Sequence, residues 1–303
     1  FIGSEITKQL SSLGANITII DNFSSGKQDY VKHLTNVNIV EGDLKDSQIV
    51  SDTVKNQEYV IHLAALPFIP DSYHLPMEFF NVNVNSTINL ALALIKENSV
   101  KRFVHISSSE IYGTAQSIPM NEDHPTLPHS TYAVSKLAGE RVVYTMHKEH
   151  EFPAVIIRPF NSFGPNITQP YIIPEVINQI INGNKKISLG NIESKRDFTF
   201  VSDTARGIIS ALVTENINGE TINVGSHRET SMKSIVDMIS KLLKTDIEIE
   251  LDSSRLRPFD VNNLVCDNTK AKELLDWSPK VTLEDGLVQT IDWVKKNGIN
   301  INK

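Results

Sequence analysis

Short apolar, β-branched runs alternate with amphipathic stretches through the first half of the chain. The runs predict strands at 16–20, 38–40, 59–63, 102–106 and 154–157, and the stretches between them predict helices at 4–13, 80–97 and 130–150. Strands that are apolar throughout and are separated by helices are typical of a parallel sheet covered on both faces. The pattern therefore predicts a doubly wound α/β fold, whose ligands bind at the carboxyl ends of the strands.

Beyond Pro165 the alternation of predicted strands and helices becomes irregular, because glycine, proline and asparagine interrupt it. A helix at 201–214 and a strand at 221–224 continue the first pattern, and helices at 231–244, 269–275 and 283–297 follow. We expect two domains: a larger one of residues 1–164 and 199–225, and a smaller mixed α/β one of residues 165–198 and 226–303. Residues 298–303 are expected to form a frayed tail.

Composition excludes several classes of protein. The chain has 303 residues, of which 40% are hydrophobic and 21% charged, and its formal net charge is −7. Such a balance suits a globular protein with a sizeable core and provides no basic field for nucleic acid or an anionic membrane. The apolar runs are too short to cross a bilayer. The single cysteine, Cys266, excludes a disulfide framework and a cysteine-rich metal site, so we expect a cytoplasmic protein without a metal.

Tyr132 and Lys136 are the most informative pair of polar residues. They are four positions apart in a predicted helix and therefore share one face. A tyrosine, with a reference pKa near ~10, becomes a useful base at neutral pH only if its phenolate is stabilised, and a nearby ammonium does this. The spacing alone is common in ordinary surface helices, so the pair needs support from other motifs.

Other motifs supply that support. Ser107-Ser108-Ser109-Glu110 follows one predicted strand, Arg158-Pro159-Phe160-Asn161 ends another, and 196–198, 257–258 and 270–277 follow in order. Together with Tyr132 and Lys136 these segments resemble the extended short-chain dehydrogenase/reductases that modify nucleotide sugars. The resemblance covers nearly the whole chain and implies a Rossmann-type domain that binds NAD and a smaller domain that binds the nucleotide sugar.

The resemblance also implies which residues bind NAD. Asp21 at a strand end is expected to bind the ribose hydroxyls and to repel a 2′-phosphate, which favours NAD over NADP, although it is also placed to cap the following turn. The family has a glycine-rich turn after its first strand, and only Gly3 matches a glycine of that turn. We therefore expect that the sequence is truncated and lacks the first strand. The remaining residues implied at the cofactor are Phe1, Ile2, Asn22, Asp43, Leu44, Leu63, Ala64, Ala65, Ser107, Tyr132, Lys136 and Pro159.

For the substrate, the resemblance implies that Arg196 and Arg257 hold the diphosphate with help from Asn161. Planar guanidinium groups pair well with phosphate oxygens. Either arginine could instead form an ordinary surface ion pair. The nucleotide base and the sugar cannot be read from these residues.

Family members are expected to begin with oxidation at C4 of the sugar, with Tyr132 as base and Ser108 bonded to the same oxygen. Glu110 then favours a 4,6-dehydratase, in which it takes the C5 proton while Ser109 helps to protonate the leaving hydroxyl. The dehydratases that act on GDP-N-acetylglucosamine are the most similar type. A 4-epimerase needs no such base and is the first alternative, and a glucuronate decarboxylase is the second. Glu110 could also be a solvated residue at a helix start.

Two further expectations come from the resemblance. A dinucleotide-binding sensor without turnover is the least favoured function, because Tyr132, Lys136 and Ser108 are all present. Helices at 83–97 and 130–150 carry apolar faces that pair across a two-fold axis in similar proteins, so we expect a homodimer, although both faces could be internal core.

Overall fold

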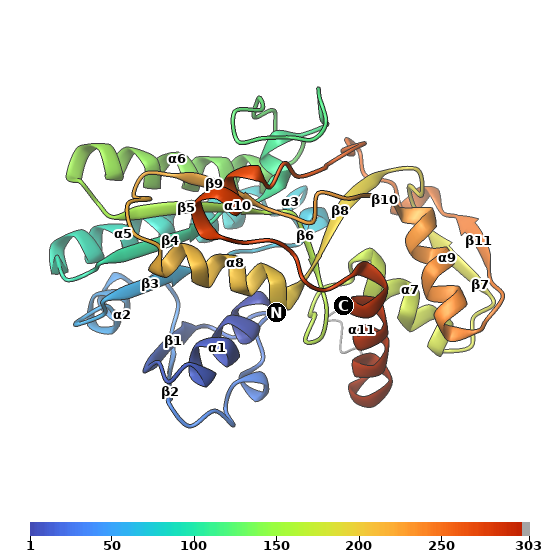
Figure 1. The fold of residues 1–303 in the computed structure, drawn as a ribbon, viewed down its shortest axis with the longest axis horizontal. Coiled ribbons are helices and arrows are strands. Elements are labelled where there is room, and N and C mark those ends of the chain that lie inside the picture. Colours follow the sequence, from blue (N-terminus) through green and yellow to red (C-terminus); the bar gives the residue numbers. More distant parts are fainter. Residues whose placement is uncertain (299–303) are drawn as a thin grey trace.

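The computed structural model describes residues 1–298 and confirms the parallel α/β fold (Figure 1). The largest sheet has the order β3-β4-β5-β9, and every neighbouring pair is parallel. Its strands are β3 (Tyr59–His62), β4 (Arg102–Ile106), β5 (Ala154–Pro159) and β9 (Thr221–Val224). β1 (Ile17–Asp21) and β2 (Val37–Glu41) form a separate parallel pair. Among the described residues β1 and β3 do not pair with each other, and both line the same cleft.

Helices cover both faces of the main sheet. Along β4 and β5, Val104 and Val155 face a core that contains Ile6 of α1 (Ile2–Ser12) and Ile208 of α8 (Val201–Val213). The alternate residue Phe103 faces a second core with α5 (Ser86–Glu97) and α6 (Thr131–His150). This alternation follows from the two-residue period of a strand, and it explains why the buried strands read as continuous apolar runs.

The second half of the chain builds a further hydrophobic core beside the sheet. It is surrounded by α7 (Ile172–Ile181), α9 (Met232–Leu243) and α11 (Leu283–Asn297). Two small sheets lie here, with the orders β10-β8-β6 and β11-β7. Their strands are β6 (Asn161–Phe163), β7 (Lys186–Leu189), β8 (Lys195–Phe200), β10 (Glu229–Ser231) and β11 (Glu248–Leu251). α10 (Thr269–Leu275) packs instead on β9 and α8. The expected domain boundaries stay a prediction.

The helix expected at 80–97 differs from the structure. The chain is helical from Pro76, as α4 (Pro76–Phe80), then passes through a π-helical turn, η2 (Asn81–Asn85), and continues as α5. An apolar period of 3.6 does not reveal one widened turn. The remaining short elements are η1 (Gln28–Tyr30), α2 (Ser47–Thr53), α3 (Ile69–Ser72), η3 (Ser109–Tyr112) and η4 (Ser253–Arg255). Most of the expected tail, residues 299–303, lies outside the described residues.

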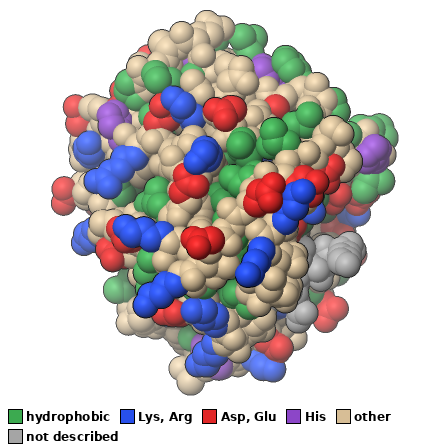
Figure 2. Space-filling model, turned by 90° about the vertical axis from the view of Figure 1, so that its right-hand side faces the viewer, with side chains coloured by type: hydrophobic (Ala, Val, Ile, Leu, Met, Phe, Trp, Pro, Cys, Tyr) green, Lys and Arg blue, Asp and Glu red, His purple; other side chains and the backbone are tan. Residues whose placement is uncertain are grey.

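The surface agrees with the modest negative charge of the sequence. Figure 2 shows acidic and basic side chains interspersed over the face that lies at the right of Figure 1, with apolar side chains between them. In residues 1–298 every helix is too short or too polar to span a bilayer.

Candidate active site

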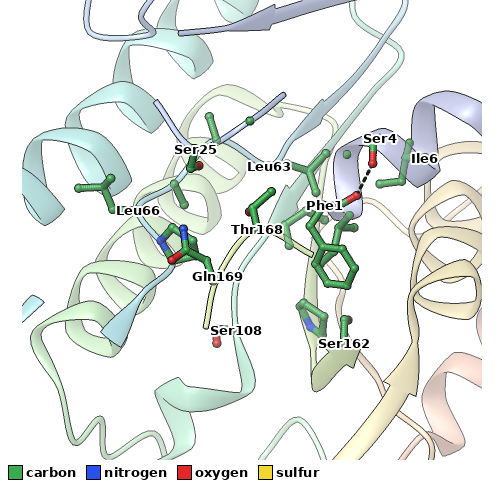
Figure 3. Close-up of a pocket in the computed structure, with 18 of the residues that line it drawn as sticks. Phe1, Ser4, Ile6, Ser25, Leu63, Leu66, Ser108, Ser162, Thr168 and Gln169 are labelled. Atoms are coloured by element: carbon green, nitrogen blue, oxygen red, sulfur yellow. Dashed lines mark hydrogen bonds between the residues drawn. The ribbon is translucent and has the colours of Figure 1, made fainter. Parts of the chain in front are cut away.

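A cleft of about 2110 Å³ lies at the carboxyl ends of β3, β4 and β5 and extends between β1 and β3. Figure 3 shows Phe1, Leu63 and Ser108 around part of it, together with Thr168 and Gln169. The last two were not predicted from the sequence. Every residue that the sequence assigned to catalysis, cofactor or substrate lines this one cleft. The fold therefore gathers the predicted residues, while their individual roles stay predictions.

Tyr132 and Lys136 both reach the cleft from the first turns of α6. Ser130 caps that helix by accepting the backbone N–H of Ala133 at 3.1 Å, which fixes where the helix begins. The ring of Tyr132 packs edge-on against Phe79 of α4, with their centroids 6.3 Å apart. The ammonium of Lys136 is buried and donates a hydrogen bond to the carbonyl of Ile106 at the end of β4, at 2.5 Å.

Burial shifts the pKa of both side chains in the direction that favours the neutral form. Desolvation raises the pKa of Tyr132 to about 12, while a hydrogen bond with Ser108 acts in the opposite direction. Desolvation lowers the pKa of Lys136 to about 8, and the carboxylate of Glu140 partly offsets this. These shifts favour the neutral phenol, so in the free protein Tyr132 is a weaker base than an ordinary tyrosine, and stabilisation of its phenolate by Lys136 stays a prediction.

Glu110 lies in the same cleft, on the short helical turn η3 that follows β4. Ser108 begins this turn, and its hydroxyl accepts the N–H of Glu110 at 3.2 Å. Only 9% of Glu110 is exposed, so the alternative of a solvated residue at a helix start is wrong. Its carboxylate Oε1 lies 3.9 Å from Nε of Arg196. A buried carboxylate paired with an arginine is placed to act on a ligand in the cleft.

Arg196 and Arg257 converge on a third residue, Asp260. Nη2 of Arg196 and Nη1 of Arg257 each lie 3.5 Å from Oδ1 of this aspartate. Arg196 is buried, so the alternative of a surface ion pair is wrong for it, whereas Arg257 is partly exposed. Asp260 and Glu110 together balance the charge of the two guanidinium groups, and the planar donors of these groups suit a ligand such as a diphosphate. Asp260 was missed in the sequence, because only the fold brings it between the two arginines.

The end of β1 fits the adenosine side of a dinucleotide. Oδ1 of Asp21 accepts the backbone N–H of Phe23 at 2.8 Å, so the turn-capping alternative accounts for one of its oxygens. A Cβ on Gly26 would lie 2.9 Å from the other oxygen, so a larger residue at this position would require the Asp21 carboxylate to shift. A Cβ built on Gly3 would approach only Leu63, at 3.8 Å. The buried hydroxyl of Ser107 has no protein partner and is available to a ligand.

A buried polar network behind the cleft was also missed. Arg158 of β5 binds both carboxylate oxygens of Glu140 on α6, at 2.6 and 3.0 Å. It also donates to the phenol oxygen of Tyr112, at 2.7 Å, and Tyr112 in turn donates to Asn223 of β9. The network joins the catalytic helix, the turn that carries Glu110 and the central sheet. Arg158 lies in a quoted motif and Glu140 in the helix expected at 130–150, but nothing in the sequence indicates that they pair.

Fold and cleft together define the class: a Rossmann-type enzyme of the short-chain dehydrogenase/reductase kind, with the tyrosine–lysine pair at its centre. The model of the GDP-mannose 4,6-dehydratase family matches residues 1–290. The chain therefore belongs to this family, within the extended short-chain dehydrogenase/reductases that act as nucleotide-sugar epimerases, dehydratases and decarboxylases.

Individual relatives perform different reactions. The chain is 31% identical to UDP-N-acetyl-alpha-D-glucosaminuronate decarboxylase of Bacillus cytotoxicus, over 98% of this chain and 95% of that protein. An epimerase of Methanothermobacter thermautotrophicus has a similar structure, with a TM-score of 0.92, 31% identity and coverage of 98% and 89%. UDP-glucuronic acid 4-epimerase of Bacillus cereus, solved with UDP-glucuronic acid and NAD, gives a TM-score of 0.90, 29% identity and coverage of 98% and 96%.

Proposed function

We propose that this protein is an NAD-dependent nucleotide-sugar 4,6-dehydratase. NAD, when bound, supplies the hydride acceptor for oxidation at C4 of the sugar and the hydride donor that completes the reaction. The residues that would hold it are those around Gly3, Asp21, Leu63, Ser107 and Lys136. Tyr132 takes the proton of the 4-hydroxyl, Lys136 stabilises the phenolate, and Ser108 hydrogen-bonds the same oxygen.

The buried carboxylate of Glu110 is the observation that carries the proposal. Oxidation at C4 acidifies the C5 proton, and Glu110 is the carboxylate beside Ser108 that we expect to remove it. Loss of the C6 hydroxyl as water follows, with Ser109 helping to protonate that hydroxyl through Glu110 or a water. A simple 4-epimerase does not need this second base.

Decarboxylation is a second candidate because of Arg196. Its guanidinium lies beside Glu110, where it could bind a carboxylate at C6 of the sugar, and a relative of this chain decarboxylates a uronate sugar. An acid at C6 that leaves as carbon dioxide from a 4-keto sugar needs no C5 proton transfer before the bond breaks. The two reactions therefore differ in the role of Glu110 and in the mass of the product.

Incubation of the full-length protein with NAD and a panel of nucleotide hexoses and uronates, followed by mass spectrometry, tests the proposal. A loss of 18 mass units is expected, while a loss of 44 would indicate decarboxylation and unchanged mass with a new retention time would indicate epimerisation. The same reaction in D₂O should place deuterium in the product. Glu110→Gln should retain oxidation at C4 yet form no dehydrated product, and normal dehydration by this variant would contradict the assignment.

We also propose a homodimer that forms through α5 and α6. Leu92 of α5 and Val134 of α6 are exposed apolar residues, with 51% and 40% of their surfaces accessible, and α5 and α6 pack against each other. Exposed apolar residues on two adjacent helices are typical of a two-fold interface. Sedimentation of the full-length protein tests this proposal, and a monomer at micromolar concentration would contradict it. Leu92→Glu should shift a dimer toward monomer.

A further inference from the structure

Tyr73, the residue that follows α3, carries a buried phenol oxygen without a hydrogen-bond partner. A buried polar atom left unpartnered costs about 1–3 kcal/mol, so native proteins rarely keep one without a reason. Among the described residues that carry such an atom, Tyr73, Ser107 and Asn161 are the ones that line the cleft. Ser107 and Asn161 already have expected ligands, the cofactor and the diphosphate. Tyr73 has none.

Tyr73 lines the same cleft as three charged residues, Arg257, Asp260 and Glu110, and all three act on its phenol electrostatically. In the proposed function Arg257 binds the diphosphate and Glu110 faces C5 of the sugar. The part of the cleft that Tyr73 shares with these groups is therefore where the proposed function places the hexosyl unit.

The backbone holds Tyr73 in place independently of its hydroxyl. The N–H of Tyr73 donates to the carbonyl of Pro70, and Ile69 and Ser72 of α3 are buried. α3 also packs against α6, the helix that carries Tyr132. The phenol is therefore presented by a fixed support, and a donor that is already positioned loses little entropy when it binds a ligand.

We propose that the phenol of Tyr73 donates a hydrogen bond to a hexosyl oxygen of the bound nucleotide sugar. The inference rests on the proposed function and adds a residue that selects the sugar. Tyr73 acts as a donor and not as a base, because burial raises its pKa and keeps the phenol protonated. Direct contact with the hexosyl unit makes it a substrate-binding residue that contributes to affinity.

Tyr73→Phe removes the hydroxyl and retains the ring. Because the hydroxyl has no partner in the free protein, the unfolding temperature should stay the same or rise. Affinity for the nucleotide sugar should fall about 3- to 10-fold, the effect of one lost hydrogen bond. Tyr171→Phe is the matched control: this phenol lines the same cleft but already donates to the carbonyl of Pro67, so its loss should lower the unfolding temperature.

Binding is measured by calorimetry in a Tyr132→Phe background, so that no turnover occurs. The probes are UDP-glucose, dTDP-glucose and GDP-mannose, each compared with its free nucleoside diphosphate. Tyr73→Phe should weaken binding of the nucleotide sugar and leave that of the nucleoside diphosphate unchanged. Equal weakening of both, or a lower unfolding temperature with unchanged affinity, overturns the inference. If the parent binds none of the nucleotide sugars, the proposed function itself fails. If parent and variant bind a nucleotide sugar equally well, only the inference about Tyr73 fails.

Discussion

The ammonium of Lys136 is hydrogen-bonded to the backbone carbonyl of Ile106, at 2.5 Å, in the interior of the protein. This bond connects the catalytic helix α6 to the end of β4, immediately before the turn that carries Ser108 and Glu110. A carbonyl is neutral and stabilises an ammonium less than a carboxylate does. Desolvation by burial lowers the pKa of Lys136 to about 8, which leaves the group protonated at neutral pH but close to its titration.

Lys136 should give the free protein a recognisable dependence of stability on pH. Its pKa is lower in the folded protein, about 8, than in the unfolded chain, 10.5, so between these values the unfolded state binds more protons and stability rises with pH. Relative to Lys136→Met, the wild type should therefore gain up to about 3 kcal/mol between pH 7 and pH 10.5. Urea unfolding of both proteins at several pH values measures this. An unchanged difference would mean that the ammonium is solvated.

Tyr132→Phe should lower kcat by about 10²- to 10⁴-fold, the usual contribution of a positioned base. The phenol also forms a hydrogen bond with Ser108, but its ring packs on Phe79 and is retained in the variant. Affinity for NAD and for the nucleotide sugar should therefore change little. Steady-state rates combined with calorimetric binding check the prediction, and a fully active variant would exclude Tyr132 as the base.

Local signals in the sequence were sufficient for most of the sheet and for the placement of Tyr132 and Lys136 in one cleft. Strand runs such as 154–157 are apolar throughout, and Tyr132 and Lys136 are one helical turn apart, so short windows reveal both. The π-helical turn at 81–85 has no such signal, because its residues alternate asparagine and valine, which does not distinguish a widened helical turn. Asp260, Tyr73 and the pairing of Arg158 with Glu140 depend on contacts between distant segments, which one sequence does not specify.

Glu140→Gln should destabilise the fold strongly. Both members of the Arg158–Glu140 pair are almost fully buried, with side chains 6% and 1% exposed. Removing one charge leaves the other buried without compensation, which typically costs about 3–5 kcal/mol. Asp237→Asn is the matched control, since its pair with Lys233 is more than half exposed and should contribute at most about 0.5 kcal/mol. Chemical denaturation measures both variants, and equal small effects would contradict the prediction.

Arg257→Gln should raise KM for the nucleotide sugar roughly 10- to 100-fold with a smaller change in kcat, because a charge-assisted hydrogen bond to the diphosphate is lost. Arg255→Gln is the comparison, because its guanidinium is already held by Glu175 and Asp252. The KM of the Arg257 variant should also depend less on ionic strength. If the two variants have the same KM, the diphosphate is held elsewhere.

Asp21 caps a turn, and substitution can separate this contact from its proposed contact with the ribose of NAD. Asn retains an oxygen that can accept the N–H of Phe23, whereas Ala removes both this bond and the charge. If the carboxylate binds the ribose hydroxyls and repels a 2′-phosphate, Asp21→Asn should weaken NAD binding several-fold and strengthen NADP binding, with little change in unfolding temperature. Asp21→Ala should shift the same preference and also lower the unfolding temperature, because the turn loses its cap. Calorimetric titration of each variant with NAD and NADP gives the ratio of dissociation constants. If the ratio of dissociation constants in Asp21→Asn equals the wild-type value, Asp21 caps the turn and does not select NAD over NADP.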